Sequence, residues 1–265
     1  MKLLLTMAIA TLAGVLLLGC GGKAESEPEP TEPANQVTAE PTDEAGPERA
    51  PLPADLADYN PEIDPANFVE RVDNPYFPLI PGTTFIFEGT SADGAERIEF
   101  KVTHDTKEIE GITATVVEDS GFVNGELKEK TLDWFAQDKD GNVWYLGEET
   151  SEYENGEVVS TFGSFQYGVD GALPGIVMPA DPQVGDRYLQ EFYVGEAEDW
   201  ATVLSIDESV SVPFGDFENC IKAEDINPFE PDVVENKYYC PGVGNVLNLK
   251  LQGGDDRVEL VDVVE

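Results

Sequence analysis

The sequence predicts an all-β protein: an antiparallel sandwich or partly closed barrel of about ten strands, built from two tandem repeats. Runs such as Thr84–Glu88 and Arg97–Thr103 alternate apolar and polar residues, as half-buried strands do. Turn signals such as Gly111 and Asn124-Gly125 recur about every eight to twelve residues. The same part of the chain has no apolar stripe at the helical period of about 3.6 residues, which argues against amphipathic helices.

The strongest strand pair is predicted in Thr131–Glu149, which reads TLDWFAQDKDGNVWYLGEE. Asp140-Gly141 lies between two aromatic-rich runs, and Asp-Gly between apolar runs is a strong hairpin signal. The register that this turn implies pairs Phe135 with Tyr145 on one face and Trp134 with Leu146 on the other. One face is expected to be core, and the other is either a second packed layer or a binding surface.

Two glycine pairs suggest an internal duplication. Gly82 and Gly185 are 103 residues apart, as are Gly141 and Gly244, and each pair lies in a similar local sequence. We therefore expect one β domain at residues 59–265, with halves at about 78–149 and 181–252 and a connecting loop at 150–180. Chance similarity between β-meanders is the alternative explanation. The apolar, glycine-rich stretch 161–180 is expected to be either a lid over the barrel or a crossover that fills the core.

The first nineteen residues have the pattern of a secretory signal peptide, with Lys2 followed by an apolar run to Leu18. Leu17-Leu18-Gly19-Cys20 resembles the bacterial lipobox, which implies cleavage before Cys20 and a lipid anchor on its sulfur. Gly21 follows in place of the aspartate that retains lipoproteins in inner membranes, so the resemblance implies the outer membrane or cell surface. The alternative is a plain signal peptide with a chance cysteine.

Residues 20–58 are predicted to form a disordered, acidic, Pro-rich tether between the lipidated cysteine and the folded domain. Glu, Pro, Ala and Thr dominate this stretch, so it cannot bury a core. Beyond it, Cys220 and Cys240 form an even pair in an exported chain, and we expect a disulfide between them. A two-ligand metal site is the weaker alternative, since neither cysteine belongs to a CxxC motif.

The chain has 54 acidic and 15 basic residues and a formal charge of −39. Such a surface repels nucleic acids and bare anionic membranes, which excludes both as partners. Three explanations of the charge stay open: adaptation to high salt, binding of divalent cations, and a solvated surface that keeps the protein soluble.

No nucleophile elbow, P-loop, dinucleotide fingerprint or HExxH zinc motif occurs, and the chain has one histidine. We therefore expect no enzymatic activity, with a carboxylate-dependent hydrolase as the alternative. The residues predicted to line a ligand pocket are the aromatic ones of the hairpin and of the segment that follows it: Trp134, Phe135, Tyr145, Phe165 and Tyr167.

The hairpin turn is also the best candidate for an ion site. Asp138, Asp140 and Asn142 place oxygens at positions one, three and five, as a calcium loop does. Position six is Val143, where an EF-hand requires glycine, and the same residues are favoured at any hairpin turn. We favour the turn, with no cofactor, and keep Ca²⁺ as the alternative.

Three motifs resemble a family of uncharacterised bacterial secreted β-rich lipoproteins: DWFAQDKDGNVWYLGE, GVDGALPGIVMPA and the YCPGVGNV run that starts at Tyr239. The resemblance covers roughly Asn74 to Leu249 and implies a fold akin to the open barrels of lipoprotein carriers, but no activity. We expect a membrane-anchored envelope lipoprotein that binds an apolar or amphipathic ligand or an envelope protein. The alternatives are a secreted hydrolase and a structural cell-surface component.

Overall fold

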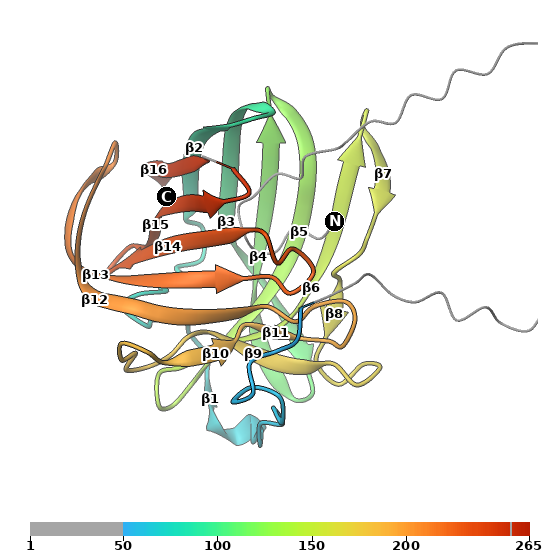
Figure 1. The fold of residues 1–265 in the computed structure, drawn as a ribbon. Helices are drawn as coiled ribbons and strands as arrows, with labels where there is room; N and C mark the ends of the chain where they lie inside the picture. Colours follow the sequence, from blue (N-terminus) through green and yellow to red (C-terminus); the bar gives the residue numbers. More distant parts are fainter. Residues whose placement is uncertain (1–49, 255) are drawn as a thin grey trace, which may run out of the picture.

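A computed structural model of the chain describes residues 50–254 and 256–265. The described residues form one antiparallel sheet of 16 strands, which curls until it is nearly closed into a barrel (Figure 1). The all-β prediction is thus confirmed, although the strands outnumber the ten expected. The predicted signal peptide, the lipidated Cys20 and most of the tether lie outside the described residues. Within these residues, no helix has the length and apolar character needed to cross a membrane.

The elements follow one another along the chain as a 3₁₀ turn and sixteen strands. They are η1 (Pro65–Asn67), β1 (Phe68–Val69), β2 (Thr84–Ser91), β3 (Gly94–Ile109), β4 (Ile112–Val123), β5 (Glu126–Asp138), β6 (Val143–Glu154), β7 (Glu157–Ser160) and β8 (Phe165–Gln166). The remainder are β9 (Leu173–Met178), β10 (Arg187–Leu189), β11 (Glu191–Phe192), β12 (Trp200–Val212), β13 (Gly215–Ile226), β14 (Val234–Cys240), β15 (Gly244–Gln252) and β16 (Arg257–Val264).

The sheet runs in the order β10-β12-β13-β14-β15-β16-β2-β3-β4-β5-β6-β9-β11. Its two terminal strands, β10 and β11, are separated in the chain by the single residue Gln190, so one short segment joins both ends of the sheet. The backbones are so close there that a Cβ atom on Gly175 of β9 would lie 2.0 Å from the carbonyl oxygen of Gln190. A glycine is required at this position because no side chain fits at the closure.

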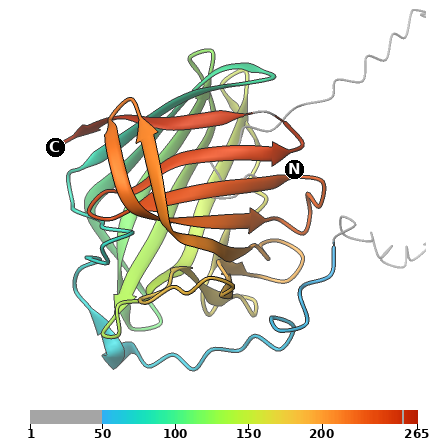
Figure 2. The ribbon, with the colours of Figure 1, turned by 60° about the vertical axis from the view of Figure 1, so that its left-hand side comes forward.

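The strands of the first half, β2 to β6, cross steeply over those of the second half, β12 to β16 (Figures 1 and 2). Each half is a meander, and the order β2-β3-β4-β5-β6 has a counterpart in β10-β12-β13-β14-β15. The duplication inferred from the glycine spacing stays a prediction. The β12–β13 hairpin bends across β14 to β16 (Figure 2), and the amide of Phe214 at its tip donates to the carbonyl oxygen of Leu260.

Several strands are longer than expected because bulges interrupt their alternation. The predicted strands 97–103 and 107–109 are one strand, β3, whose pairing with β4 shifts register between Val102 and Thr106. An extra residue at a bulge reverses which side chains face inward, so a search for strict alternation splits the strand in two.

The stretch 150–180 is not the single connecting loop that was predicted. It contains the end of β6 and all of β7, β8 and β9, and the last three each pair with β6. Phe165 and Met178 are buried in the main core. Of the two interpretations of residues 161–180, this arrangement is the crossover that fills the core.

The predicted disulfide between Cys220 and Cys240 is confirmed. The two residues lie opposite each other on β13 and β14, with Cα atoms 4.2 Å apart, and both are fully buried. The bond closes a loop with a sequence separation of 20, which stabilises the fold by about 3 kcal/mol in the chain-entropy model.

The predicted tether extends too far toward the domain. At least residues 50–58 are packed: Leu56 is buried against Leu189 and Trp200, and the amide of Ala50 donates to the carbonyl oxygen of Pro228. Charge and proline content concealed the short apolar anchor that Leu52 and Leu56 provide within this segment.

An irregular segment, Val72–Leu79, crosses one end of the barrel, and we call it the strap. It contacts the turns of both meanders: the Gln137 side chain accepts from the backbone amide of Asn74, and the Gly242 amide donates to the carbonyl oxygen of Pro75. Asn74 also donates from Nδ2 to the carbonyl oxygen of Gly141 over 2.9 Å. The strap therefore ties the β5–β6 turn to the β14–β15 turn.

Candidate functional site

The inner surface of the sheet changes from aromatic to acidic across neighbouring strands. In one row of paired residues, Phe85 of β2 lies beside Phe100 of β3, and Phe100 lies beside Asp119 of β4. In an adjacent row, Val102 and Val117 are followed by Asp133 and Glu148. The barrel thus encloses an apolar half on β2 and β3 and a carboxylate-rich half on β4 to β6.

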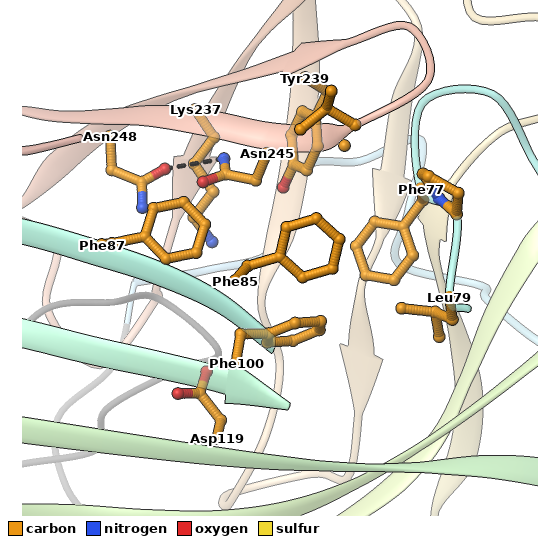
Figure 3. Close-up of a pocket in the computed structure, with 13 residues that line it drawn as sticks. Phe77, Leu79, Phe85, Phe87, Phe100, Asp119, Lys237, Tyr239, Asn245 and Asn248 are labelled. Atoms are coloured by element: carbon orange, nitrogen blue, oxygen red, sulfur yellow. Dashed lines mark hydrogen bonds between the residues drawn. The ribbon is translucent and has the colours of Figure 1, made fainter. Parts of the chain in front are cut away.

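A pocket with a cavity volume of about 50 Å³ lies between the strap and the apolar half of the barrel (Figure 3). This volume holds a few water molecules and is smaller than that of most small-molecule sites, so the pocket would enclose only part of a ligand. Its walls are mostly apolar and come from the strap, β2, β3 and the β14–β15 hairpin. They include the rings of Phe77, Phe85, Phe87, Phe100 and Tyr239. Phe77 is held in edge contact with Phe100 and Phe135, with ring centroids 6.4 and 5.2 Å apart.

The polar lining of the pocket comes from Asp119, Lys237, Asn245 and Asn248 (Figure 3). Asn245 donates from Nδ2 to Oδ1 of Asn248 over 2.9 Å, and its own Oδ1 is buried without a hydrogen-bond partner among the described residues. The Lys237 Nζ lies 2.8 Å from Oδ2 of Asp225, and both side chains are almost fully buried. The pocket is therefore amphipathic.

Burial shifts the pKa of the ionisable groups around this lining. Desolvation raises the pKa of Asp119 to about 7, although the nearby Lys237 ammonium opposes the shift. The pKa of Glu235 is raised to about 7 for the same reason and with the same opposing charge. Burial alone would lower the pKa of Lys237, but the carboxylates of Asp225 and Glu235 outweigh it and raise the pKa. Lys237 is therefore a cation held among several carboxyl groups.

Behind the pocket, Asp133, Tyr145 and Glu148 form a buried hydrogen-bonded cluster. The Tyr145 hydroxyl lies 2.5 Å from Oδ1 of Asp133 and 3.0 Å from Oε2 of Glu148. A phenol has one proton to donate, so the second contact requires a carboxyl that keeps its own proton. Desolvation, together with the charges of Asp119 and Glu148, raises the pKa of Asp133 well above its usual range. The cluster can hold and share a proton, but Asp133 is 0% exposed and cannot meet a substrate in this conformation.

A β-bulge creates this cluster. The register of β5 against β6 shifts between Trp134 and Phe135. Phe135 pairs with Tyr145, whereas Trp134 pairs with Gly147 and Asp133 pairs with Glu148. The predicted pairing of Trp134 with Leu146 is wrong for this reason, whereas Phe135 and Tyr145 pair as predicted. Gly147 has φ 141° and lies against the backbone of Phe165, where a Cβ would come within 2.3 Å of a carbonyl oxygen. The approach of β8 therefore requires glycine at the bulge.

The five predicted pocket residues separate into two groups. Phe135, Tyr145 and Phe165 lie together inside the barrel, with ring centroids of 4.8 Å for the first pair and 5.5 Å for the second. Trp134 and Tyr167 belong to a separate cluster on the outer face, where the Lys107 ammonium lies 3.1 Å from the Trp134 ring. None of the five lines the Phe-lined pocket, although Phe135 contacts Phe77 directly behind its wall.

Two of the three residues predicted to bind an ion, Asp138 and Asn142, already use their side-chain oxygens as hydrogen-bond acceptors within and beside the hairpin turn. Asp138 accepts backbone hydrogen bonds from Asp140 and Asn142 on Oδ1, and side-chain bonds from Asn142 and Trp144 on Oδ2. Oδ1 of Asn142 accepts from the amide of Ala180, which leaves Asp140 as an exposed carboxylate at the tip. In the parts of the chain that the structure describes, no group of three or more His, Cys, Asp or Glu side chains is arranged to hold a metal ion. Calcium binding stays a prediction.

The sequence analysis missed the residues that line the pocket. Phe85, Phe87 and Phe100 follow the inward alternation of β2 and β3, which was visible, but the strap that covers them has no regular pattern. The sequence analysis also missed the burial of Lys237. Lys130, which precedes the first-half hairpin as Lys237 precedes the second-half one, is half-exposed and pairs with Glu118, whereas Lys237 is buried. A lysine among strand residues gives no sign of its burial.

No protein-family model matches the chain, and no curated protein matches it. Among solved structures, the chain is similar to a protein of Bacteroides fragilis described as exported and as having a YmcC-like fold, with 14% identity and a TM-score of 0.43. It is also similar to a Parabacteroides distasonis protein described as a lipoprotein, with 13% identity and a TM-score of 0.41. Each match covers 72% of this chain and 99% of the other. The family expected from the sequence motifs stays a prediction.

Proposed function

We propose that this protein is an exported, lipid-anchored envelope protein that binds a small apolar or amphipathic ligand in the Phe-lined pocket without catalysing a reaction. The observation that carries this proposal is the pocket itself: an apolar cavity of about 50 Å³ with polar groups along one part of its lining. A packed core would fill such a space, since protein interiors are close-packed. Apolar walls that carry a small number of polar groups are typical of ligand sites.

The position of the carboxylates supports binding over hydrolysis. Asp119 is the one carboxylate that lines the pocket, and Asp133 and Glu148 lie behind the wall. Hydrolysis by a carboxylate pair requires both groups to flank the bond that is cleaved. A pocket with one carboxylate and five aromatic rings fits a carrier or binding protein better than a glycosidase-like site.

Binding can be measured with N-phenyl-1-naphthylamine, a neutral apolar dye whose fluorescence rises in an apolar site. We expect saturable binding by the unaltered protein. Phe85→Ala should weaken it by about tenfold or more, because about 1.4 kcal/mol of lost apolar contact suffices for that change. Leu79→Trp should block the pocket and leave the rest of the sheet intact.

Ile86→Ala is the matched control, since Ile86 is on the same strand as Phe85 but faces the other side of the sheet. It should leave dye binding unchanged. Thermal melts would verify that each variant is folded. A folded protein that does not bind the dye, or binding that Phe85→Ala and Leu79→Trp leave unaltered, would contradict the proposal.

The proposed anchor is tested separately. Cys20→Ser removes the sulfur that would carry the lipid, so the protein should move from the detergent phase to the aqueous phase in a Triton X-114 extraction. Retention of the variant in the detergent phase would show that another feature holds the protein at the membrane.

A further inference from the structure

The polar part of the pocket lining offers hydrogen-bond acceptors to a ligand, from Asn245 and Asp119. The Nδ2 group of Asn245 already donates to Oδ1 of Asn248. The Oδ1 atom of Asn245 is a buried acceptor without a hydrogen-bond partner among the described residues. Asp119, an acceptor when it is ionised, lies beside Phe100 on the neighbouring strand. A buried acceptor that lacks a donor destabilises the protein, and a ligand that donates a hydrogen bond to it would remove that cost.

The charges around the lining favour a cation. Lys237 is the cation among the described residues that line the pocket, and its ammonium is paired with Asp225 at 2.8 Å. Glu235, on the same strand, and Asp119, across the pocket, act on the same ammonium. Glu235 also faces the Lys250 ammonium, which is paired with Asp256 at 2.8 Å. Asp119, Asp225, Glu235 and Asp256 thus outnumber the two ammonium groups, and their ionisation leaves the region with a net negative charge. A carboxylate or phosphate on a ligand would be repelled there, whereas a positive group would be attracted.

The walls of the pocket suit the same group. Five aromatic rings line it, and their π-systems attract an alkylammonium more strongly than an anion. The rings also bury methylene groups of a ligand, which favours binding because each methylene leaves water.

We propose that the ligand is an aliphatic amine in its protonated form. Its ammonium group donates to Oδ1 of Asn245 and is attracted by the charge of Asp119 across the pocket, and its hydrocarbon part packs among Phe77, Phe85 and Phe100. This inference rests on the proposed binding function and specifies the chemical class of the ligand.

Three probes with the same chain separate the head group from the tail: octylammonium, octanoate and octan-1-ol. They would be titrated calorimetrically at pH 8.0 in about 0.5 M NaCl, because that salt concentration screens attraction of the amine to the acidic surface. We expect octylammonium to bind at least about tenfold more tightly than octanoate, with octan-1-ol between them.

Asp119→Asn should reduce the advantage of octylammonium over octan-1-ol by about tenfold, which corresponds to about 1.4 kcal/mol. Glu118→Gln is the matched control: it removes the same charge from the adjacent residue of β4, whose side chain faces outward and pairs with Lys130. This control should leave all three affinities unchanged, while Phe85→Ala should weaken all three.

The outcomes distinguish the two proposals. Equal binding of the three probes, or tighter binding of octanoate, would overturn the amine assignment and leave the binding function intact. An equal effect of Asp119→Asn and Glu118→Gln would overturn it as well, since the amine would then be responding to overall charge. If folded protein binds none of the probes and no neutral dye, the proposed function itself fails.

Discussion

The Tyr145 hydroxyl contacts the two buried carboxyl groups of Asp133 and Glu148, and one of these carboxyls must keep its own proton. Asp119 and Glu235 have pKa values raised to about 7, and burial raises those of Glu129 and Asp133 well above their usual range. An unfolded chain would release these protons near pH 4. The folded state therefore binds more protons than the unfolded state between about pH 4 and the raised values.

This proton uptake predicts a stability that falls as the pH rises. The contribution of each raised carboxyl is complete below about pH 4 and is lost as the pH passes through its folded value. We expect the melting temperature to be higher at pH 5.5 than at pH 8.5. Asp133→Asn removes one of these titrations and keeps an acceptor for the Tyr145 hydroxyl, so its melting temperature should vary less with pH.

The control for this prediction is Glu157→Gln, which alters an exposed carboxylate of β7 and should keep the pH dependence of the unaltered protein. Differential scanning calorimetry at a series of pH values measures both variants. A melting temperature that rises between pH 5.5 and 8.5 would show that the interior carboxyls are not protonated in the folded state.

The sequence predicted strand register correctly where residues close in the chain determine it. The pairing of Phe135 with Tyr145 follows from the Asp-Gly turn, because a short turn fixes the register of the strands next to it. The burial of Asp119 and Lys237 does not follow from local sequence. Both are charged residues in alternating strands, and the inward orientation of each becomes clear only once the sheet closes and the strap covers it.

At the scale of single elements, the aspartates of the β5–β6 turn could either hold the turn by hydrogen bonds or bind calcium, and two substitutions distinguish these roles. Asp138→Ala would leave four donors without their acceptor and should destabilise the protein by about 2–4 kcal/mol. Asp140→Ala alters an exposed tip residue and should change stability by less than about 0.5 kcal/mol. Urea denaturation, with 5 mM calcium or with EDTA, measures both.

The turn and the calcium hypotheses predict different patterns in this experiment. If the aspartates serve the turn alone, calcium changes neither the unaltered protein nor the variants. If they hold an ion, calcium should stabilise the unaltered protein, and both Asp138→Ala and Asp140→Ala should abolish that response.

Elements also show why the site was predicted only in part. The sequence indicates the β5–β6 hairpin but not its bulge, since the bulge depends on the contact of Gly147 with β8, a strand nearly twenty residues later. Without the bulge, Asp133 would pair with Gly147 and the carboxyl cluster would not form. The stretch 161–180 was uncertain for a similar reason, because a lid and a buried crossover require the same apolar residues.

For the whole molecule, the charge of −39 should make stability depend strongly on salt. Folding brings like charges together, and the screening length falls from about 10 Å at 0.1 M to about 3 Å at 1 M salt. We expect the melting temperature to rise by several degrees between 0.05 and 1 M NaCl, and by the same amount in KCl.

This prediction separates the explanations of the acidic composition. A melting temperature that is insensitive to NaCl and KCl, yet rises with millimolar CaCl₂, would contradict screening and indicate specific binding of divalent cations. Equal stabilisation by both monovalent salts indicates relief of repulsion between the surface carboxylates.

The fold as a whole was the most predictable property, because alternation and turn spacing act along the entire chain. The sequence did not predict how the two ends of the sheet meet to close the barrel. The joining of both sheet ends through Gln190 depends on contacts among β9, β10 and β11, strands of two to six residues that give little signal. The positions of the pocket and of the interior carboxyls both depend on that closure.

The strap determines when the pocket can form. Phe77 and its neighbours are synthesised early, yet Tyr76 bonds to Asn219, 143 residues later, and Pro75 bonds to Gly242 of the last hairpin but one. Contacts between such distant parts of a chain form late in folding. In a growing chain that has reached β13, Phe77, Phe85 and Phe100 are therefore exposed to water and form an aggregation-prone apolar surface. These rings are enclosed only after β14 and β15 have been synthesised. Secretion in an unfolded state would delay collapse until the complete chain is present.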